Sequence, residues 1–412
     1  MRLSLISTLL LLPFAASHAQ SHERARDLGI PLDGTPGKYN AITDVRGVKV
    51  GHSTIIRGSG PLLVGQGPVR TGVTAIYPGS DSILQPVFAG WFSLNGNGEM
   101  TGTAWIEEYG ELLYPVLITN TNSVGTVRDA VIEWGMKRVT EDAWNCCLPV
   151  VAETWDGSLS DIFGFHVQKQ HVFAALDSAR SGPVQEGNVG GGTGMECLGW
   201  KGGIGTSSRL AAMGTDTFTV GVLVQCNFGS RSQLRIAGIP VGREITAPPD
   251  CYDTRGPLDS AQARFRCPDV RGDAGPYDPD RPGPVPEDHG SIIAIVATDA
   301  PLLPHQLKRI AKRVALGIGR MGGVAGSSSG DLFLAFSTAP AEPNEGLILN
   351  QRMVHDNLIS PLYSATVQAT EEAIINAMLA AETMVGANSL RVTALPHDQV
   401  RAILQRHTLL TK

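Results

Sequence analysis

The chain has 412 residues, of which 42% are hydrophobic and 17% are charged, and it contains 48 glycines and 26 prolines. This composition excludes a disordered chain and a coiled coil, and the length suffices for a large buried core. The formal net charge of −6, without blocks of lysine and arginine, excludes a basic nucleic-acid-binding protein.

The N-terminus has the pattern of a secretory signal peptide. Arg2 supplies the positive charge, Leu3–Leu12 is a short apolar run, and Ser17 and Ala19 are small residues before a cleavage site. The run is shorter than the roughly 20 residues that span a bilayer. We expect residues 1–19 to be removed and the mature protein to be soluble and periplasmic. A buried N-terminal helix is the alternative.

Strand-like and helix-like stretches alternate from Ile42 to about Gly242. The predicted strands, bounded by turn residues, are Val45–Val50, Gly72–Tyr77, Val116–Thr119 and Phe218–Gln225. Ser123–Trp134 carries apolar residues near helical spacing, and Asn122 is the candidate cap of this helix.

Residues 246–289 differ in composition from the rest of the chain. They are rich in proline and aspartate and have almost no hydrophobic periodicity, which predicts an exposed, poorly structured linker. The β-branched apolar run Ser291–Thr298 follows directly and is typical of a fully buried central strand.

The C-terminal part is predicted to contain two helices and a strand. Pro301 and Pro304 open a helix whose apolar face continues to Ile318. Leu332–Ser337 is the strand, and a long helix from about Thr366 to Val385 ends at Gly386. Strands and helices without strict βαβ alternation favour a layered α+β sandwich over a doubly wound sheet.

The cysteines and histidines do not indicate a metal site. No two cysteines form a CxxC pair, and the only HxxxH spacing, His18 and His22, straddles the signal cleavage site. Export permits disulfides, and Cys251 and Cys267, which flank a polar loop, are a plausible pair. The adjacent Cys146 and Cys147 are expected to be ordinary buried thiols.

The junction Gly290–Ser291 is the most informative feature of the sequence. A proline-rich loop runs directly into a core strand whose first residue is a serine, and a central strand does not require a hydroxyl there. A self-cleaving N-terminal nucleophile does, because the hydroxyl attacks the preceding carbonyl and the freed α-amine then serves as its base. The alternative is a serine at a strand start with no chemistry.

A second candidate nucleophile lies in the serine-rich stretch Gly326–Gly330, which matches GxSxG. A hydrolase elbow needs a strand before the serine and a helix after it, whereas the predicted order here is the reverse. A conventional esterase would use Ser329 in this turn with His355, His397 or His407 as base. The preferred interpretation is a loop that presents Ser329 and Asp331 beside another site.

Other motifs are weaker by themselves. The glycine-dense stretch 187–195 lacks the features of a phosphate-binding loop and predicts a tight structural loop, and Asn95–Glu99 predicts a turn. Glu153 follows an apolar run, where it is either a binding site for a substrate ammonium group or a surface acid. Asn227 follows the apolar run that ends at Gln225 and Cys226. Its side-chain amide is either a hydrogen-bond donor to an oxyanion or a buried amide hydrogen-bonded to the backbone.

Several long segments resemble the self-processing β-peptidyl aminopeptidases and the related L-aminopeptidase/D-esterase-amidases. The matching segments are Asn95–Gly102, Val150–Gly157, Glu186–Arg209, Leu223–Gly229, Gly290–Leu307 and Ser329–Ser337, and the likeness extends from about Ile30 to Val392. The resemblance implies a four-layer αββα sandwich like that of N-terminal nucleophile hydrolases. It also implies cleavage at Gly290–Ser291 into an α subunit, 20–290, and a β subunit, 291–412, which form one composite catalytic domain.

The resemblance also implies roles for individual residues. Ser291 is the implied nucleophile, Asn227 the oxyanion-hole amide, Ser329 and Asp331 the pair that orients Ser291, and Glu153 the acid that holds the substrate amino group. Trp155 stands where some relatives carry tyrosine, so a contribution to the oxyanion hole is in question.

The implied enzyme is an exported serine aminopeptidase that acts through an acyl-enzyme. It removes a small N-terminal residue, such as a β-amino acid, D-Ala, Gly or a small L-residue, from short peptides, amides and esters. The implied assembly is a tetramer of αβ units, and no cofactor, nucleic acid or membrane is implied. The alternatives are the conventional esterase based on Ser329 and a non-catalytic binding protein.

Overall fold

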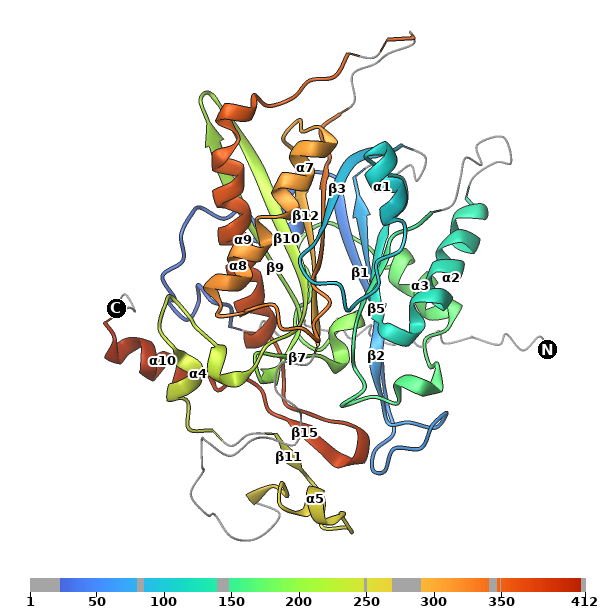
Figure 1. Cartoon of the computed structure of the whole chain (residues 1–412), viewed down its shortest axis with the longest axis vertical. Coiled ribbons are helices and arrows are strands. Elements are labelled where there is room, and N and C mark those ends of the chain that lie inside the picture. Colours follow the sequence, from blue (N-terminus) through green and yellow to red (C-terminus); the bar gives the residue numbers. More distant parts are fainter. Residues whose placement is uncertain are drawn as a thin grey trace, which may run out of the picture.

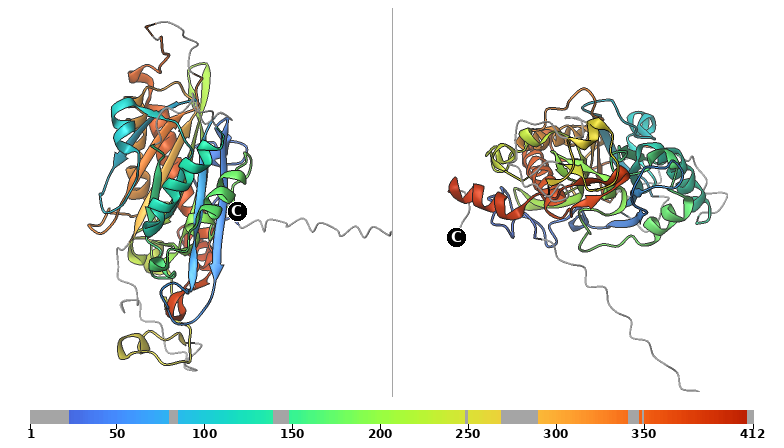
Figure 2. Two further views of the ribbon diagram at one scale, coloured as in Figure 1. Left: turned by 90° about the vertical axis from the view of Figure 1, so that its right-hand side faces the viewer. Right: turned by 90° about the horizontal axis from the view of Figure 1, so that it is seen from below.

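The computed structural model of the chain describes residues 23–79, 85–138, 148–247, 250–268, 290–340, 347–348 and 350–408. Two large β-sheets lie face to face, and helices cover the outer face of each (Figure 1). In the view from below in Figure 2, the helices that cover the two sheets lie on opposite sides of the molecule. The predicted α+β sandwich with four αββα layers is confirmed.

The first sheet has four strands, in the order β1 (Val48–Arg57), β2 (Val69–Pro78), β5 (Val116–Asn120) and β6 (Val151–Thr154). Its outer face is covered by α2 (Val124–Met136) and α3 (Lys169–Asp177). The apolar residues of this layer include Leu117, Val131 and Val172.

The second sheet has six strands, in the order β4 (Glu111–Leu112), β3 (Val87–Ser93), β13 (Leu332–Ser337), β12 (Ser291–Thr298), β10 (Asp216–Asn227) and β9 (Gly203–Met213). It is covered by α7 (Pro304–Ala311), α8 (Val314–Arg320) and α9 (Ser360–Leu379). The residues on both sides of the Gly290–Ser291 bond therefore contribute neighbouring strands to one sheet.

Strand β12 connects the two core layers because its side chains alternate between the faces of the sheet. Ile293 and Ile295 pack between the two sheets, whereas Ile292 and Ala294 pack under the helices. All eight residues of the strand are buried, so the predicted central strand is confirmed. By the same alternation, Ser291 faces the space between the sheets.

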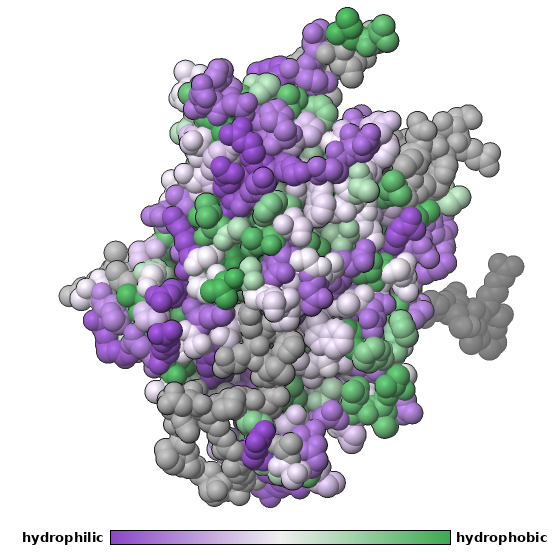
Figure 3. Space-filling model, in the orientation of Figure 1, coloured by the Kyte–Doolittle hydropathy of each residue, from purple (hydrophilic) through white to green (hydrophobic). Residues whose placement is uncertain are grey.

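Short elements complete the fold. They are α1 (Thr103–Tyr109), β7 (Glu196–Cys197), β8 (Trp200–Lys201), α4 (Val241–Glu244), β11 (Cys251–Tyr252), α5 (Ser260–Ala263), β14 (Met384–Val385), β15 (Leu390–Val392) and α10 (His397–Arg406). On the face in Figure 3, hydrophobic residues lie in small groups among hydrophilic ones. In the described residues, no helix combines the length and apolar character needed to cross a membrane.

The predicted linker 246–289 is folded in its first part. Strand β11 pairs with β15, and Asp259 caps α5 by accepting a hydrogen bond from the Gln262 N–H at 2.7 Å. The predicted disulfide between Cys251 and Cys267 is present, with Cα atoms 4.9 Å apart. The prediction of a poorly structured segment was therefore wrong here, because a disulfide and a strand pairing order residues that lack hydrophobic periodicity.

Helix boundaries differ from the predictions in three places. Asn122 lies in a 3-10 turn before α2 and donates to the Ile162 carbonyl at 3.3 Å instead of capping the helix. The helix after Pro304 is divided into α7 and α8. The last long helix begins at Ser360 and ends at Leu379, since Met384 and Val385 pair with β15 instead.

Three sequence predictions lie outside the described residues. These are the signal peptide 1–19, the thiols Cys146 and Cys147, and the second part of the linker, 269–289.

Candidate active site

The candidate site lies where strands from both sheets end close together. Ser291 begins β12 and is the register partner of Asn227, the last residue of the antiparallel strand β10. Across the sandwich, Glu153 lies on β6 of the other sheet. The stacking of the two sheets thus brings a hydroxyl, an amide and a carboxylate to one edge.

A cavity of about 670 Å³ opens at this edge. Gly290, Ser291, Glu153 and Trp155 all line it, together with Asn97, Gly98, Glu99, Thr121, Ser158 and Ser328. Four of the seven residues predicted for the site therefore line one cavity, and the other three, Asn227, Ser329 and Asp331, are bonded to this group or lie beside it.

Ser291 is held by the loop that precedes β13. Its Oγ accepts a hydrogen bond from the Gly330 N–H at 3.0 Å. Asp331 Oδ1 accepts from the Ser329 hydroxyl at 2.6 Å and from the Ile292 N–H at 3.2 Å. The Ser329–Asp331 pair therefore lies directly beside Ser291, as the sequence predicted.

This geometry does not resemble a hydrolase elbow. Helix α8 precedes the loop and β13 follows it, which is the reverse of the strand–turn–helix order. The Ser329 hydroxyl donates to a carboxylate, and no histidine lines the cavity within the part of the chain that the structure describes.

Gly290 occupies a position that only glycine fits. Its φ is +115°, and a Cβ atom there would lie 1.9 Å from the Asn227 carbonyl oxygen and 2.7 Å from Asn227 Nδ2. The Asn227 amide is therefore immediately beside the Gly290–Ser291 peptide bond.

The Asn227 side chain has a fixed orientation. Its Oδ1 accepts from the Glu196 N–H at 2.7 Å, and its Nδ2 donates to the Trp155 carbonyl oxygen at 2.9 Å. An amide nitrogen carries two hydrogens, so a second donor remains for a developing oxyanion.

Glu153 is a buried acid, only 3% exposed, and not a surface residue. Its Oε1 accepts from the Glu99 N–H at 2.9 Å, and Thr121 donates its hydroxyl to Oε2. Burial raises the pKa of Glu153, although the hydrogen bonds from Thr121 and Glu99 oppose this shift. A buried carboxylate at a cavity wall is suited to bind a cationic group.

Trp155 contributes to the site in two ways. Its backbone carbonyl, not its indole, is the group that contacts Asn227. Trp155 is 39% exposed, and its ring packs edge-on against Phe163, with 6.2 Å between the ring centroids. Of these two aromatic residues, Trp155 lines the cavity.

Sequence analysis missed several residues of the site. Thr121 carries no pattern that marks it. Gly330 and Glu196 lie in the GxSxG match and in a family-matching segment, but they act through backbone N–H groups whose partners depend on tertiary packing. The Asn95–Glu99 segment was predicted only as a turn, but Asn97, Gly98 and Glu99 line the cavity. Asn97 Nδ2 donates to the Ser328 carbonyl at 2.7 Å, which ties this turn to the serine-rich loop.

The glycine-dense stretch is a structural loop, as predicted. Gly190–Gly194 forms a buried 3-10 turn, and a Cβ at Gly191 would lie 2.2 Å from the Gln225 side chain. Close packing explains these glycines without a phosphate ligand.

Comparison with known proteins is consistent with this geometry. The model of peptidase family S58 matches residues 40–392. The β-peptidyl aminopeptidase BapA of Sphingosinicella microcystinivorans is 50% identical over 386 residues, which cover 93% of this chain and 92% of that protein.

Solved structures also match nearly the whole chain. The L-aminopeptidase D-Ala-esterase/amidase of Ochrobactrum anthropi, described as a prototype for the serine aminopeptidases, superposes with a TM-score of 0.80 at 45% identity, covering 94% of this chain and 99% of that one. A β-aminopeptidase from a Burkholderia species superposes with a TM-score of 0.78 at 42% identity, and the match covers 93% of this chain and 99% of that one.

The fold is therefore that of the N-terminal nucleophile hydrolases, in the variant described for the Ochrobactrum enzyme. The chain belongs to peptidase family S58, and the family resemblance predicted from its sequence is confirmed.

Proposed function

We propose that this chain is a self-processing serine aminopeptidase that removes a small N-terminal residue from short peptides, amides and esters. The observation that carries the proposal is the position of Ser291, at the start of a buried strand, in a cavity that also contains Glu153. The aminopeptidase names of the relatives support it.

Self-processing begins with attack of Ser291 Oγ on the Gly290 carbonyl carbon. The new C–O bond replaces the C–N bond between the two residues, and the hydroxyl proton goes to the released α-amine. Water then hydrolyses the ester. The products are an α subunit that ends at Gly290 and a β subunit that begins at Ser291, and the two remain joined through the shared sheet.

Turnover repeats the same chemistry on a substrate. The freed α-amine, with an unperturbed pKa of about 7.7–8.0, accepts the Ser291 proton near neutral pH and passes it to the leaving amine or alcohol. Asn227 Nδ2 donates to the oxyanion, while Ser329 and Asp331 orient the nucleophile. Water hydrolyses the acyl-enzyme, and no cofactor takes part.

Substrate selection follows from the cavity wall. Glu153 pairs with the free ammonium group of the substrate, which explains why an N-terminal residue is removed. The relatives' names point to β-amino acids and D-Ala as first residues. The apolar ring of Trp155, which lines the cavity, is available to the leaving group.

Export to the periplasm and assembly into a tetramer of αβ units are further parts of the proposal. The first rests on the N-terminal sequence and the second on the family resemblance. Light scattering of the mature protein tests the second, with four αβ units as the expected mass.

The deciding experiment compares turnover of a β-alanyl anilide by the wild type and by Ser291→Ala. The proposal predicts that Ser291→Ala loses all measurable turnover. A variant that still hydrolyses the substrate would favour the conventional esterase with Ser329 as its nucleophile. A wild-type protein that stays uncut and hydrolyses no aminoacyl amide or ester would favour the binding-protein alternative.

A further inference from the structure

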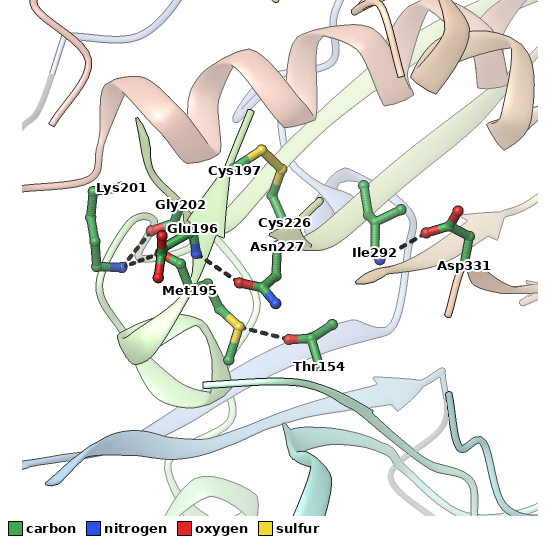
Figure 4. Close-up of a disulfide and its surroundings, with 10 residues drawn as sticks. All are labelled: Thr154, Met195, Glu196, Cys197, Lys201, Gly202, Cys226, Asn227, Ile292 and Asp331. Carbon is green, nitrogen blue, oxygen red and sulfur yellow. Dashed lines mark hydrogen bonds between the residues drawn. A yellow bond between two sulfur atoms is a disulfide. The ribbon is translucent and has the colours of Figure 1, made fainter. Parts of the chain in front are cut away.

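A second disulfide, between Cys197 and Cys226, lies directly behind Asn227 (Figure 4). Its Cα atoms are 5.4 Å apart, and sequence analysis did not predict it. Cys197 follows Glu196, whose N–H binds Asn227 Oδ1, and Cys226 precedes Asn227. The covalent link therefore joins the two residues that flank this one hydrogen bond.

The disulfide and the cavity lie on opposite faces of the sheet at this point. Cys197 and Cys226 are completely buried in the core layer under the helices. Asn227, the next residue of β10, points to the opposite face of the sheet, where the cavity lies. The disulfide is thus shielded from the site but fixes the backbone that supports it.

The hydrogen bond from Glu196 matters because an asparagine amide has two different ends. A backbone N–H pairs only with the oxygen end, so it holds Nδ2 toward Trp155 and Gly290. Rotation of the amide by half a turn would place a carbonyl oxygen where the oxyanion develops, which repels the negative charge.

The β7–β8 hairpin that carries Glu196 leads directly into β9, whose first residue, Gly203, is the register partner of Cys226 on β10. Arg231, which follows β10, donates to the Gly199 carbonyl in the hairpin. The Leu198 N–H donates to the Phe228 carbonyl at 2.6 Å. Lys201, which is buried, donates its Nζ to the carbonyls of Met195 and Gly202, the residues immediately before and after the hairpin. The disulfide is the covalent attachment of this hairpin to the strand that ends in Asn227.

We propose that the Cys197–Cys226 disulfide positions the Asn227 amide for self-processing and for turnover. It keeps the Glu196 N–H against Asn227 Oδ1, so that Nδ2 faces the carbonyl under attack. This inference rests on the proposed function, in which Asn227 stabilises the oxyanion.

The test compares Cys197→Ala/Cys226→Ala with the matched control Cys251→Ala/Cys267→Ala, both in the full chain. The rate of precursor cleavage and the kcat and KM for a β-alanyl anilide are measured well below each melting temperature. We expect kcat and the cleavage rate to fall about tenfold in the first variant, with KM unchanged within twofold. The control is expected to keep wild-type values.

A second variant, Cys197→Val/Cys226→Ala, fills part of the space of the lost sulfur atoms. It therefore distinguishes the effect of losing the covalent link from the effect of a packing defect. Wild-type kcat in either folded variant, or a parallel loss in the control, would overturn the inference. Failure of both variants to fold would also overturn it, since the disulfide would then be required for folding and not for positioning.

Asn227→Ala distinguishes this inference from the proposed function. Loss of an oxyanion donor is expected to lower kcat by about 10²–10³-fold. If Asn227→Ala is impaired but the cysteine variants are not, only the inference fails. If Asn227→Ala keeps wild-type kcat, the proposed role of Asn227 fails with it.

Discussion

At the scale of single residues, the site depends on groups that burial makes reactive or selective. Glu153 is held by Thr121 and the Glu99 N–H, and burial raises its pKa above the usual range for a carboxyl group. A buried carboxylate interacts more strongly with an ammonium group than an exposed one does, since the local dielectric is lower.

The first prediction concerns Glu153→Gln. The glutamine keeps the shape of the side chain but removes the charge, so KM for a free-amine substrate is expected to rise about 10–100-fold with little change in kcat. Steady-state kinetics on a β-alanyl anilide measure this. Glu108→Gln is the control, because Glu108 is an exposed acid that does not line the cavity. Equal KM values for Glu153→Gln and the wild type would contradict the ammonium-binding role.

The second prediction concerns the acidic limb of the pH profile. Protonation of Glu153 removes its charge, and its pKa is raised by burial. As the pH falls, kcat/KM is therefore expected to decrease at a higher pH than the ordinary glutamate value of about 4.3 would give. The Ser291 α-amine must be neutral to act as the base, so its protonation gives a separate limb at higher pH in both proteins. Only the lower-pH step is expected to disappear in Glu153→Gln, and persistence of that step would assign it to another group.

At the scale of elements, the junction between the linker and β12 combines strain with close packing. Gly290 has a positive φ and touches both the backbone and the side chain of Asn227. The junction is where the sequence is most informative, because a proline-rich segment meets a continuous apolar strand.

The third prediction is that Gly290→Ala blocks self-processing. The new Cβ would overlap the Asn227 carbonyl and displace the amide beside the scissile bond, so cleavage is expected to slow at least about 100-fold. Gel electrophoresis of purified precursor over time measures the rate. Gly60→Ala is the control, since Gly60 has φ +90° but its Cβ would have no neighbour within 4 Å. Processing of Gly290→Ala at the Gly60→Ala rate would argue against this account of the junction.

Prediction from sequence succeeded for elements with a strong local pattern. The runs of β10, β12 and β13 are continuous and apolar because these strands are covered on both faces, so their positions were visible in the sequence. The predicted C-terminal end of α9 was wrong because Met384 and Val385 pair with β15, and this tertiary contact leaves no local pattern in the sequence.

The candidate site was partly visible for a related reason. Ser291, Asn227 and Glu153 each stand at or near the end of an apolar run, but their convergence depends on how two sheets stack, which no local pattern encodes. The disulfide between Cys197 and Cys226 was missed because the intervening β9 and β10 hairpin brings together residues that are 29 positions apart.

At the scale of the whole molecule, the four layers bury several ionisable groups. Asp156 is fully buried beside the site and accepts a hydrogen bond from Asn120 Nδ2 at 3.1 Å. Burial raises the pKa of Asp156 to about 7. The folded chain therefore retains a proton on Asp156 in a pH range where the unfolded chain has lost it.

The fourth prediction follows from this linkage. Between pH 4 and pH 7 the folded state binds more protons at Asp156, so this group lowers the free energy of unfolding by up to about 1.4 kcal/mol per pH unit as the pH rises. Asp156→Asn removes that slope. The variant is expected to gain stability relative to its parent from pH 4 to pH 7, with no further gain above.

Chemical denaturation of both proteins in the Ser291→Ala background, where one uncut chain unfolds, measures the difference. The other buried carboxylates titrate in parent and variant alike, so their contributions cancel in the difference between the two unfolding free energies. A difference in unfolding free energy that does not change with pH would contradict the raised pKa of Asp156.

The central claim is that Ser291 cuts the chain before it and becomes the N-terminal nucleophile. The most direct test is the mass and N-terminal sequence of the purified, reduced protein, beside those of Ser291→Ala. The account predicts two chains in the wild type, the smaller beginning Ser-Ile-Ile-Ala-Ile-Val, and one uncut chain in Ser291→Ala. A single wild-type chain, or efficient cutting of Ser291→Ala, would contradict it.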